Sequence, residues 1–176
     1  MSTTALSATP QWLSPHLRQL LRYHGWAYRR LIDSLQRLEA TAYQAPCGLF
    51  FGSPHGTLNH LAVADRIWLA RVRGEPAPFT RLDAEVATDL AGVRDFIAEG
   101  IAGWQAWLQA RDDHGLSQVL TYRNSRGDAF SRVLADVLLH LVNHGSHHRG
   151  QISAALTSLG QPAPVLDYIY FLNESP

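Results

Sequence analysis

Four of the nine histidines of this chain lie within nine residues: His140, His144, His147 and His148. Side chains four residues apart on an α-helix lie about one turn apart on the same face. His140 with His144, and His144 with His148, are therefore two pairs that can each bind one metal ion. Neutral imidazole is a common ligand of divalent transition metals. The segment predicts a metal site, and spacing alone leaves the choice of pair open.

The apolar residues of the same segment distinguish the two pairs. Placed at about 100° per residue from Leu134, they form a stripe between about −60° and +40°. Its members are Val137, Leu138, Leu141, Ile152, Ala155, Leu156 and Leu159. His148 falls at about −40°, inside the stripe, and His144 at about −80°, at its edge. His140 and His147 fall near −120° and −140°, toward solvent or a neighbour. The predicted inward pair is His144 and His148.

A metal in the core of a helical bundle needs ligands from facing helices. His60 is the candidate on a second helix, because it lies at about −100° from Leu61, on the flank of the apolar face. Asp65 lies about 140° away from His60, within the apolar face, so the two side chains are not expected to bind one metal. A carboxylate there needs a partner, and Arg149 or a histidine N–H is expected to supply it.

The elements that must position these residues are mostly helical. Four long helices are expected, over residues 14–39, 57–73, from just after Leu82 to Arg111, and from a cap at Ser131 to Leu159. The stretches 116–122 and 128–130 flank a polar turn that ends in Gly127, which predicts a β-hairpin before the last long helix. The apolar tail, residues 166–172, is expected to dock on the helices.

Composition limits the classes of function. The length fits one domain, residues 1–176, and 46% of the residues are hydrophobic. Fifteen basic residues balance fifteen acidic ones, without the basic stripe that nucleic-acid binding requires. The lone Cys47 excludes an intrachain disulfide. The first ten residues carry no basic segment typical of a signal peptide, and no apolar run reaches membrane-spanning length. These features favour a cytoplasmic protein.

Two motifs resemble those of a known family. The segment Thr57-Leu-Asn-His60-Leu-Ala-Val-Ala-Asp65-Arg-Ile-Trp-Leu resembles the second-helix motif of the DinB family. The segment Asn143-His144-Gly-Ser-His-His148-Arg-Gly-Gln151 is similar to its fourth-helix signature. The turn after Tyr122 and the tail from Asp167 to Leu172 are also similar, so the resemblance covers nearly the whole chain. His24 stands where Asn is common in the family.

The resemblance implies an all-α, up-down-down-up four-helix bundle with a long crossover. It also implies a metal site of His60, His144 and His148, and a relationship to thiol S-transferases that use bacillithiol or mycothiol and to metal-dependent isomerases. Zn²⁺ or Ni²⁺ is the favoured metal, and Fe²⁺ and Mn²⁺ also bind imidazole. Other members of the family are linked to DNA damage or stress without an assigned chemistry.

The leading hypothesis is a metal-dependent S-transferase that adds a low-molecular-weight thiol to an electrophile. Three imidazoles leave a position for the thiolate, and His147, Arg149 or His24 is expected to orient its anionic parts. The alternatives are a non-catalytic metal-binding stress protein and a structural bundle whose histidines only satisfy hydrogen bonds in the core. A homodimer formed through an apolar helix face is compatible with such a bundle, and the sequence does not identify the face.

Overall fold

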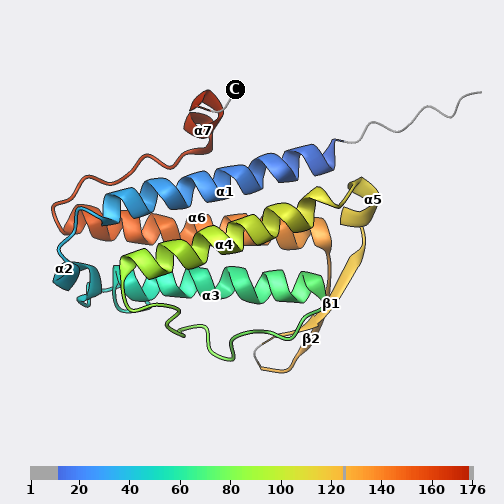
Figure 1. Ribbon diagram of the computed structural model, residues 1–176, viewed down its shortest axis with the longest axis horizontal. Helices are drawn as coiled ribbons and strands as arrows, with labels where there is room; N and C mark the ends of the chain where they lie inside the picture. The colour runs from blue at the N-terminus through green and yellow to red at the C-terminus, as the bar shows by residue number, and fades with distance from the viewer. Residues whose placement is uncertain (1–11, 125, 175–176) are drawn as a thin grey trace, which may run out of the picture.

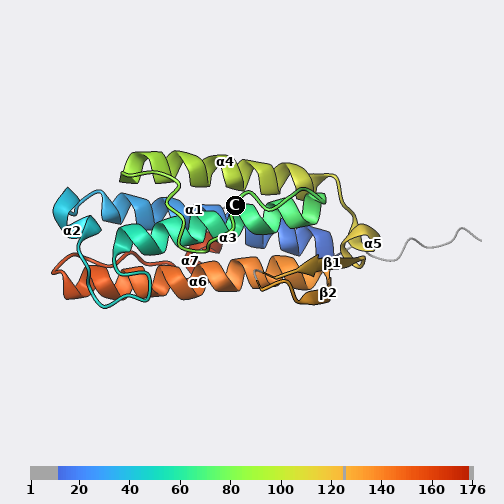
Figure 2. The ribbon, with the colours of Figure 1, turned by 90° about the horizontal axis from the view of Figure 1, so that it is seen from below.

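Four long helices lie side by side in the computed structural model, which describes residues 12–124 and 126–174 (Figure 1). They are α1 (Leu13–Leu35), α3 (Pro54–Arg73), α4 (Leu90–Gln109) and α6 (Leu134–Ser158). In Figure 1, α1 and α6 run from right to left, and α3 and α4 run from left to right. Both α1 and α3 contact α4 and α6, so the helices enclose a common core. The turned view in Figure 2 shows α3 beside α6 along most of its length.

Shorter elements connect and extend the long helices. They are α2 (Ala40–Gln44), α5 (Asp113–Leu116), β1 (Val119–Arg123), β2 (Ala129–Val133) and α7 (Tyr168–Glu174). The strands form the predicted antiparallel hairpin, in which Tyr122 pairs with Phe130. The predicted docking of the tail is also confirmed, because Phe171 is buried against Tyr23 and Trp26. Met1 to Pro10, which carry the expectation about targeting, lie outside the described residues.

Local capping explains where two of the helices begin. The Ser53 side chain accepts a hydrogen bond from the Gly56 N–H at 3.0 Å, and Pro54 stands at the first helical position of α3. The prediction that the third long helix begins just after Leu82 is wrong. Asp89 caps α4 by accepting from the Gly92 N–H at 2.7 Å, and residues 75–89 instead form an irregular crossover along the bundle.

Two other predicted helix ends are corrected by the structure. The first helix ends at Leu35, before the separate helix α2, and does not reach Glu39. Ser131 does not cap the last long helix, because it lies in β2 opposite Thr121, with their hydroxyl oxygens 3.1 Å apart. The first N–H of α6, that of Leu134, donates instead to the Gln118 carbonyl at 2.9 Å.

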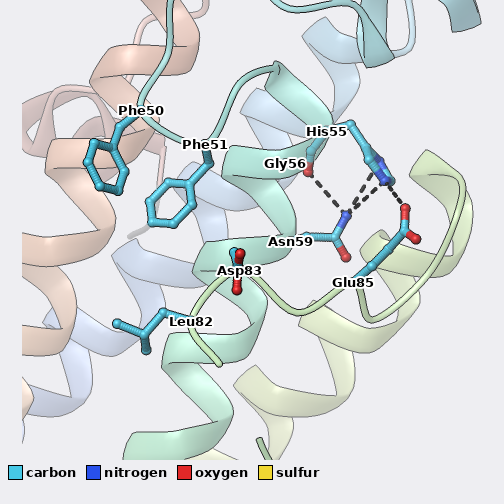
Figure 3. A pocket seen from close by; sticks show the side chains of 8 residues that line it. All are labelled: Phe50, Phe51, His55, Gly56, Asn59, Leu82, Asp83 and Glu85. Atoms are coloured by element: carbon cyan, nitrogen blue, oxygen red, sulfur yellow. Dashed lines mark hydrogen bonds and ion pairs between the residues drawn. The ribbon is translucent and has the colours of Figure 1, made fainter. Parts of the chain in front are cut away.

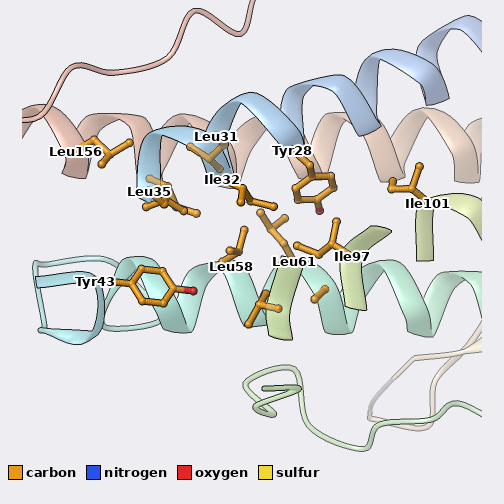
Figure 4. Packing of buried hydrophobic residues seen from close by; sticks show 13 residues of the cluster. Tyr28, Leu31, Ile32, Leu35, Tyr43, Leu58, Leu61, Ile97, Ile101 and Leu156 are labelled. Carbon is orange, nitrogen blue, oxygen red and sulfur yellow. The ribbon is translucent and has the colours of Figure 1, made fainter. Parts of the chain in front are cut away.

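The core follows the apolar stripes of the four helices. One cluster fills the end of the bundle near α2 (Figure 4), and its fully buried members include Leu31, Leu58, Leu61 and Ile152. A second cluster lies toward the hairpin and contains Trp104, which is completely buried. Within the described ranges, none of the helices combines the length and the apolar character needed to cross a bilayer. The mostly helical fold with one small hairpin is as the sequence predicted.

Candidate metal centre

The structure brings His60, His144 and His148 together between α3 and α6. One nitrogen from each ring lies within 4.8 Å of the other two. The closest pair is His60 Nε2 and His144 Nε2, at 3.2 Å. Two imidazole nitrogens on one tetrahedral metal, each about 2.0–2.1 Å from it, lie about 3.3 Å apart. The spacing of this pair therefore fits a shared divalent metal.

Hydrogen bonds on the far side of two rings fix which nitrogen faces the centre. His60 Nδ1 lies 2.9 Å from the Leu82 carbonyl oxygen, which can only accept, so Nδ1 carries the proton. His148 Nδ1 likewise donates to Gln151 Oε1 at 2.7 Å. Both rings are left with an unprotonated Nε2, the form that binds metal. Such bonds orient metal-binding histidines and raise their basicity.

The surroundings keep the three imidazoles neutral. Burial, together with the neighbouring rings of His148 and His60, lowers the pKa of His144 to about 3. Burial is also the main reason that the pKa values of His60 and His148 lie below the ordinary 6.5. No proton has to leave at neutral pH before a metal can bind.

The chemistry of the donor set separates a metal site from a purely structural cluster. A hydrogen bond from His144 Nε2–H to His60 Nε2 would satisfy these two rings. It would leave His148 Nε2 without a hydrogen-bond partner among the described residues. A divalent cation would accept all three lone pairs at once, so the donor set fits a metal.

Phe51 forms a wall of the site. Its ring stacks on His60, with centroids 3.8 Å apart and planes inclined by 15°, and it meets His148 edge-on at 5.7 Å. Phe51 and Leu82 also border a cavity of about 660 Å³ (Figure 3). The stacked ring restricts the His60 imidazole and keeps water from one face of it.

Asn59 ties the crossover to α3 beside His60. Its Oδ1 accepts from the Val86 N–H at 2.7 Å, and its amide donates to the His55 carbonyl at 3.1 Å (Figure 3). His55 Nε2 lies 2.6 Å from a Glu85 carboxylate oxygen, which adds a second tie. These bonds hold the segment that carries the Leu82 carbonyl to His60. The Asn-His pair in the α3 motif was the only sequence signal of this arrangement.

Asp65 is not a member of the three-histidine group. It is buried, as predicted, and its Oδ2 accepts from His24 Nε2–H and from the Tyr28 hydroxyl, both at 3.1 Å. Arg149 completes the chain by donating to His24 Nδ1 at 3.1 Å. A neutral imidazole thus bridges a buried cation and a buried anion. Burial lowers the pKa of His24, against the opposing effect of Asp65.

The other two histidines of the α6 cluster contact the ligand rings but do not join the three-histidine group. His147 is exposed, and the Gln151 amide donates to its Nε2 at 3.2 Å. Gln151 thus lies between His147 and His148 and bonds to both. His140 packs edge-on against Trp68 at 5.3 Å and is absent from the three-histidine group. His24 and Arg149 are 0% and 1% exposed and bond to each other, so the expectation that they orient a bound thiol lacks structural support.

An open cleft of about 740 Å³ begins at His60 and His144 and runs toward the hairpin. Its floor is formed by α3 and α6, and the crossover and the hairpin form its sides. The volume is within the usual range for small-molecule sites. Two of the three histidines, His60 and His144, therefore lie at the end of a space that a small ligand can enter.

A family model described as the DinB family matches residues 1–175 of this sequence. The chain belongs to the DinB family. The protein DinB of Bacillus subtilis (strain 168) is 24% identical over 160 residues, which cover 88% of this chain and 92% of that protein. A DinB-like protein from Bacillus cereus ATCC 10987 has a crystal structure that covers 83% of this chain and 94% of its own, with a TM-score of 0.64 and 18% identity. The structural likeness shows a shared fold, and the family resemblance predicted from the two histidine motifs is confirmed.

Sequence reasoning missed two groups of this DinB family site. The Leu82 carbonyl belongs to a segment expected to enter a helix, where its oxygen would have been used by the backbone. Gln151 stands in the quoted α6 motif, but its bond to His148 depends on side-chain conformation. Spacing of three residues on one helix was the available signal.

Proposed function

We propose that this DinB family protein is a divalent-metal-dependent enzyme that transfers a low-molecular-weight thiol to an electrophile, on an up-down-down-up bundle. The observation that supports it is the convergence of three neutral imidazoles, His60, His144 and His148, the first two of which border the end of an open cleft. Zn²⁺ or Ni²⁺ suits these ligands best, and Fe²⁺ or Mn²⁺ can replace them according to supply. A closed structural site would have four protein ligands.

The residues of the chain have separable tasks in this reaction. His60, His144 and His148 hold the metal, which when bound lowers the pKa of a thiol and directs its sulfur. Leu82 and Gln151 keep the rings of His60 and His148 aimed at the centre. The cleft holds the electrophile beside the sulfur, and orientation of this kind accelerates bond formation without a further catalyst.

The reaction balances without an oxidant or a reductant. With a chlorinated electrophile, a sulfur–carbon bond forms, the carbon–chlorine bond breaks with its electron pair on chloride, and the thiol proton goes to solvent. With an activated double bond, the sulfur bonds to one carbon and a proton reaches the other. Both reactions need only the thiol and the electrophile.

The test is turnover of monochlorobimane, whose thiol adducts fluoresce. Protein purified without a nickel column is loaded with Zn²⁺, Ni²⁺, Fe²⁺ or Mn²⁺ and assayed with glutathione, mycothiol and bacillithiol. We expect turnover with at least one pair, lost in His148→Ala and kept in His114→Ala, a variant of an exposed histidine remote from the site. Metal-loaded protein that turns over none of the three thiols refutes the proposal and favours the non-catalytic metal-binding protein.

A further inference from the structure

The cleft extends from the histidine centre along three turns of α3. His60, Ala64, Trp68 and Arg71 border it from α3, and His144 and His140 border it from α6. Arg71 lies eleven positions after His60, which corresponds to about 16 Å along the helix. The hairpin segment from Thr121 to Asn124 borders the same cleft near Arg71. A ligand with one end at the metal therefore has a second, distant end within the same space.

Arg71 is held at that second end by two aromatic rings. Its guanidinium carbon lies 4.5 Å from the Trp68 ring centroid and 4.8 Å from that of Tyr122. One terminal nitrogen donates to the Arg123 carbonyl at 3.1 Å. Stacking and this hydrogen bond restrict the side chain, so little conformational freedom remains to be lost when a ligand binds.

The guanidinium has no carboxylate partner within the part of the chain that is described. Arg30, Arg66, Arg81 and Arg94 each form an ion pair with an acidic side chain, whereas Arg71 forms none. Burial lowers the pKa of Arg71, which shows that its surroundings penalise the charge. Most of its five N–H donors are still available, in a fork that matches a carboxylate.

The other charged groups of the cleft do not neutralise Arg71. Glu75 borders the same space but forms no ion pair with Arg71 among the described residues, and Arg123 adds a second positive charge. His140 faces Arg71 from α6 and is neutral, because burial and the Arg71 charge lower its pKa. The far end of the cleft is thus positive, half-buried and flanked by aromatic rings.

We propose that Arg71 is an anion-recognition residue, and that the ligand of this cleft carries a carboxylate remote from its metal-binding atom, on the order of 10–15 Å away along the cleft. The inference rests on the proposed function only in taking the metal-binding atom to be a thiol sulfur. It places recognition of the anionic part at Arg71, in contrast to the sequence-based assignment to His147, Arg149 or His24. The middle of the ligand passes Trp68 and is expected to be apolar.

Paired synthetic thiols test this assignment by binding alone. The probes are 8-mercaptooctanoate and 8-mercaptooctanol, which have the same length and differ in charge, and the short 3-mercaptopropionate. Each is titrated into the Zn²⁺-loaded protein, and the dissociation constant is measured by calorimetry. We expect the long carboxylate to bind on the order of 10- to 100-fold more tightly than the alcohol, as charge-assisted bonds to a guanidinium provide.

Arg71→Gln is expected to abolish that preference while it leaves the affinity for the alcohol and for 3-mercaptopropionate unchanged. Arg71→Lys keeps the charge without the planar fork and should retain a part of the preference. Arg73→Gln is the matched control, because Arg73 is exposed on the same turn, contacts the Gly103 carbonyl and does not border the cleft. Thermal unfolding of each variant verifies that it folds.

Equal binding of the two long probes by the unmodified protein overturns the inference, and so does a carboxylate preference that survives in Arg71→Gln. Octanoate, which lacks sulfur, separates this result from the proposed function. Its binding should weaken in Arg71→Gln and not in Arg73→Gln, even if no thiol is ever turned over. Octanoate binding that is equal in all three proteins also overturns the inference.

Discussion

Replacing His148 with Ala should sharply reduce metal affinity, whereas replacing His140 with Ala should not. The two residues belong to alternative His-x-x-x-His pairs that share His144. Only His148 joins the three-histidine group, and His140 instead packs against Trp68. The comparison therefore tests whether the helix face or the spacing selects the ligands.

The magnitude follows from the number of ligands. Structural zinc sites with four ligands bind with about 10–16 kcal/mol, or roughly 3–4 kcal/mol per ligand. Loss of one ligand from a group of three therefore weakens binding by about 10²–10³-fold. His140→Ala removes no ligand and should change the affinity by less than about threefold, since it alters only aromatic contacts, those with Trp68 and His144.

The assay is a competition titration of Zn²⁺ between the protein and a chromophoric chelator of known affinity. The protein is purified without a nickel column and stripped of metal beforehand. Circular dichroism before and after the titration verifies that each variant keeps its helices. The ligand assignment is refuted if His140→Ala loses the metal and His148→Ala keeps it, because the helical stripe would then have selected the wrong pair.

Three further predictions concern the parts that support the site. Asn59→Ala should weaken Zn²⁺ binding about tenfold and lower the free energy of unfolding by about 1–3 kcal/mol, since it frees the crossover that brings Leu82 to His60. An unchanged Zn²⁺ affinity in the same titration would show that the crossover does not need the Asn59 hydrogen bond. Gly145→Ala should lower the free energy of urea unfolding by about 1–3 kcal/mol, because its methyl group overlaps buried His24 and Arg149. Gly150→Ala, on the same helix with open space around it, should be neutral or stabilising, and similar losses in both would contradict the packing argument. The metal-free protein should lose stability as the pH falls below 6.5, the ordinary histidine pKa, because burial lowers the pKa of His24, His60, His144 and His148 in the folded state and the unfolded chain takes up the protons first. Urea unfolding at pH 7.0 and 5.5 should differ by at least about 1 kcal/mol, and equal values would contradict neutral, buried histidines in the folded protein.

The histidine pair on α6 was determined by the sequence alone. The period of the helix and the apolar stripe are local properties, and together they placed His144 and His148 on the inward side. The same logic made His60 a candidate on α3 and kept Asp65 away from it. The hairpin followed from a polar turn ending in Gly127, which has a φ of +90°. That the three histidines bind metal stays a prediction for the titration to decide.

Helix ends that depend on competing bonds were not determined locally. Residues 83–89 were expected to belong to a helix, but Asn59 binds the backbone of Val86 and Ala87, and Asp89 caps the helix that follows. Ser131 is a suitable cap by type, yet its pairing in the hairpin removes it from that role. In both cases the helix end is set by hydrogen bonds to residues that are distant in the sequence or by a cap that lies further along the chain.

The surroundings of the histidines were decided only by the tertiary structure. The Leu82 carbonyl reaches His60 across 22 residues, and His24 bonds to Arg149 across 125. The hairpin positions the Arg71 side chain, because the Tyr122 ring and the Arg123 carbonyl contact it at the end of the cleft. Side-chain type and helical period say which face a residue occupies. They cannot say which segment, folded back from elsewhere, will supply its partner, because that choice depends on the packing of the whole chain.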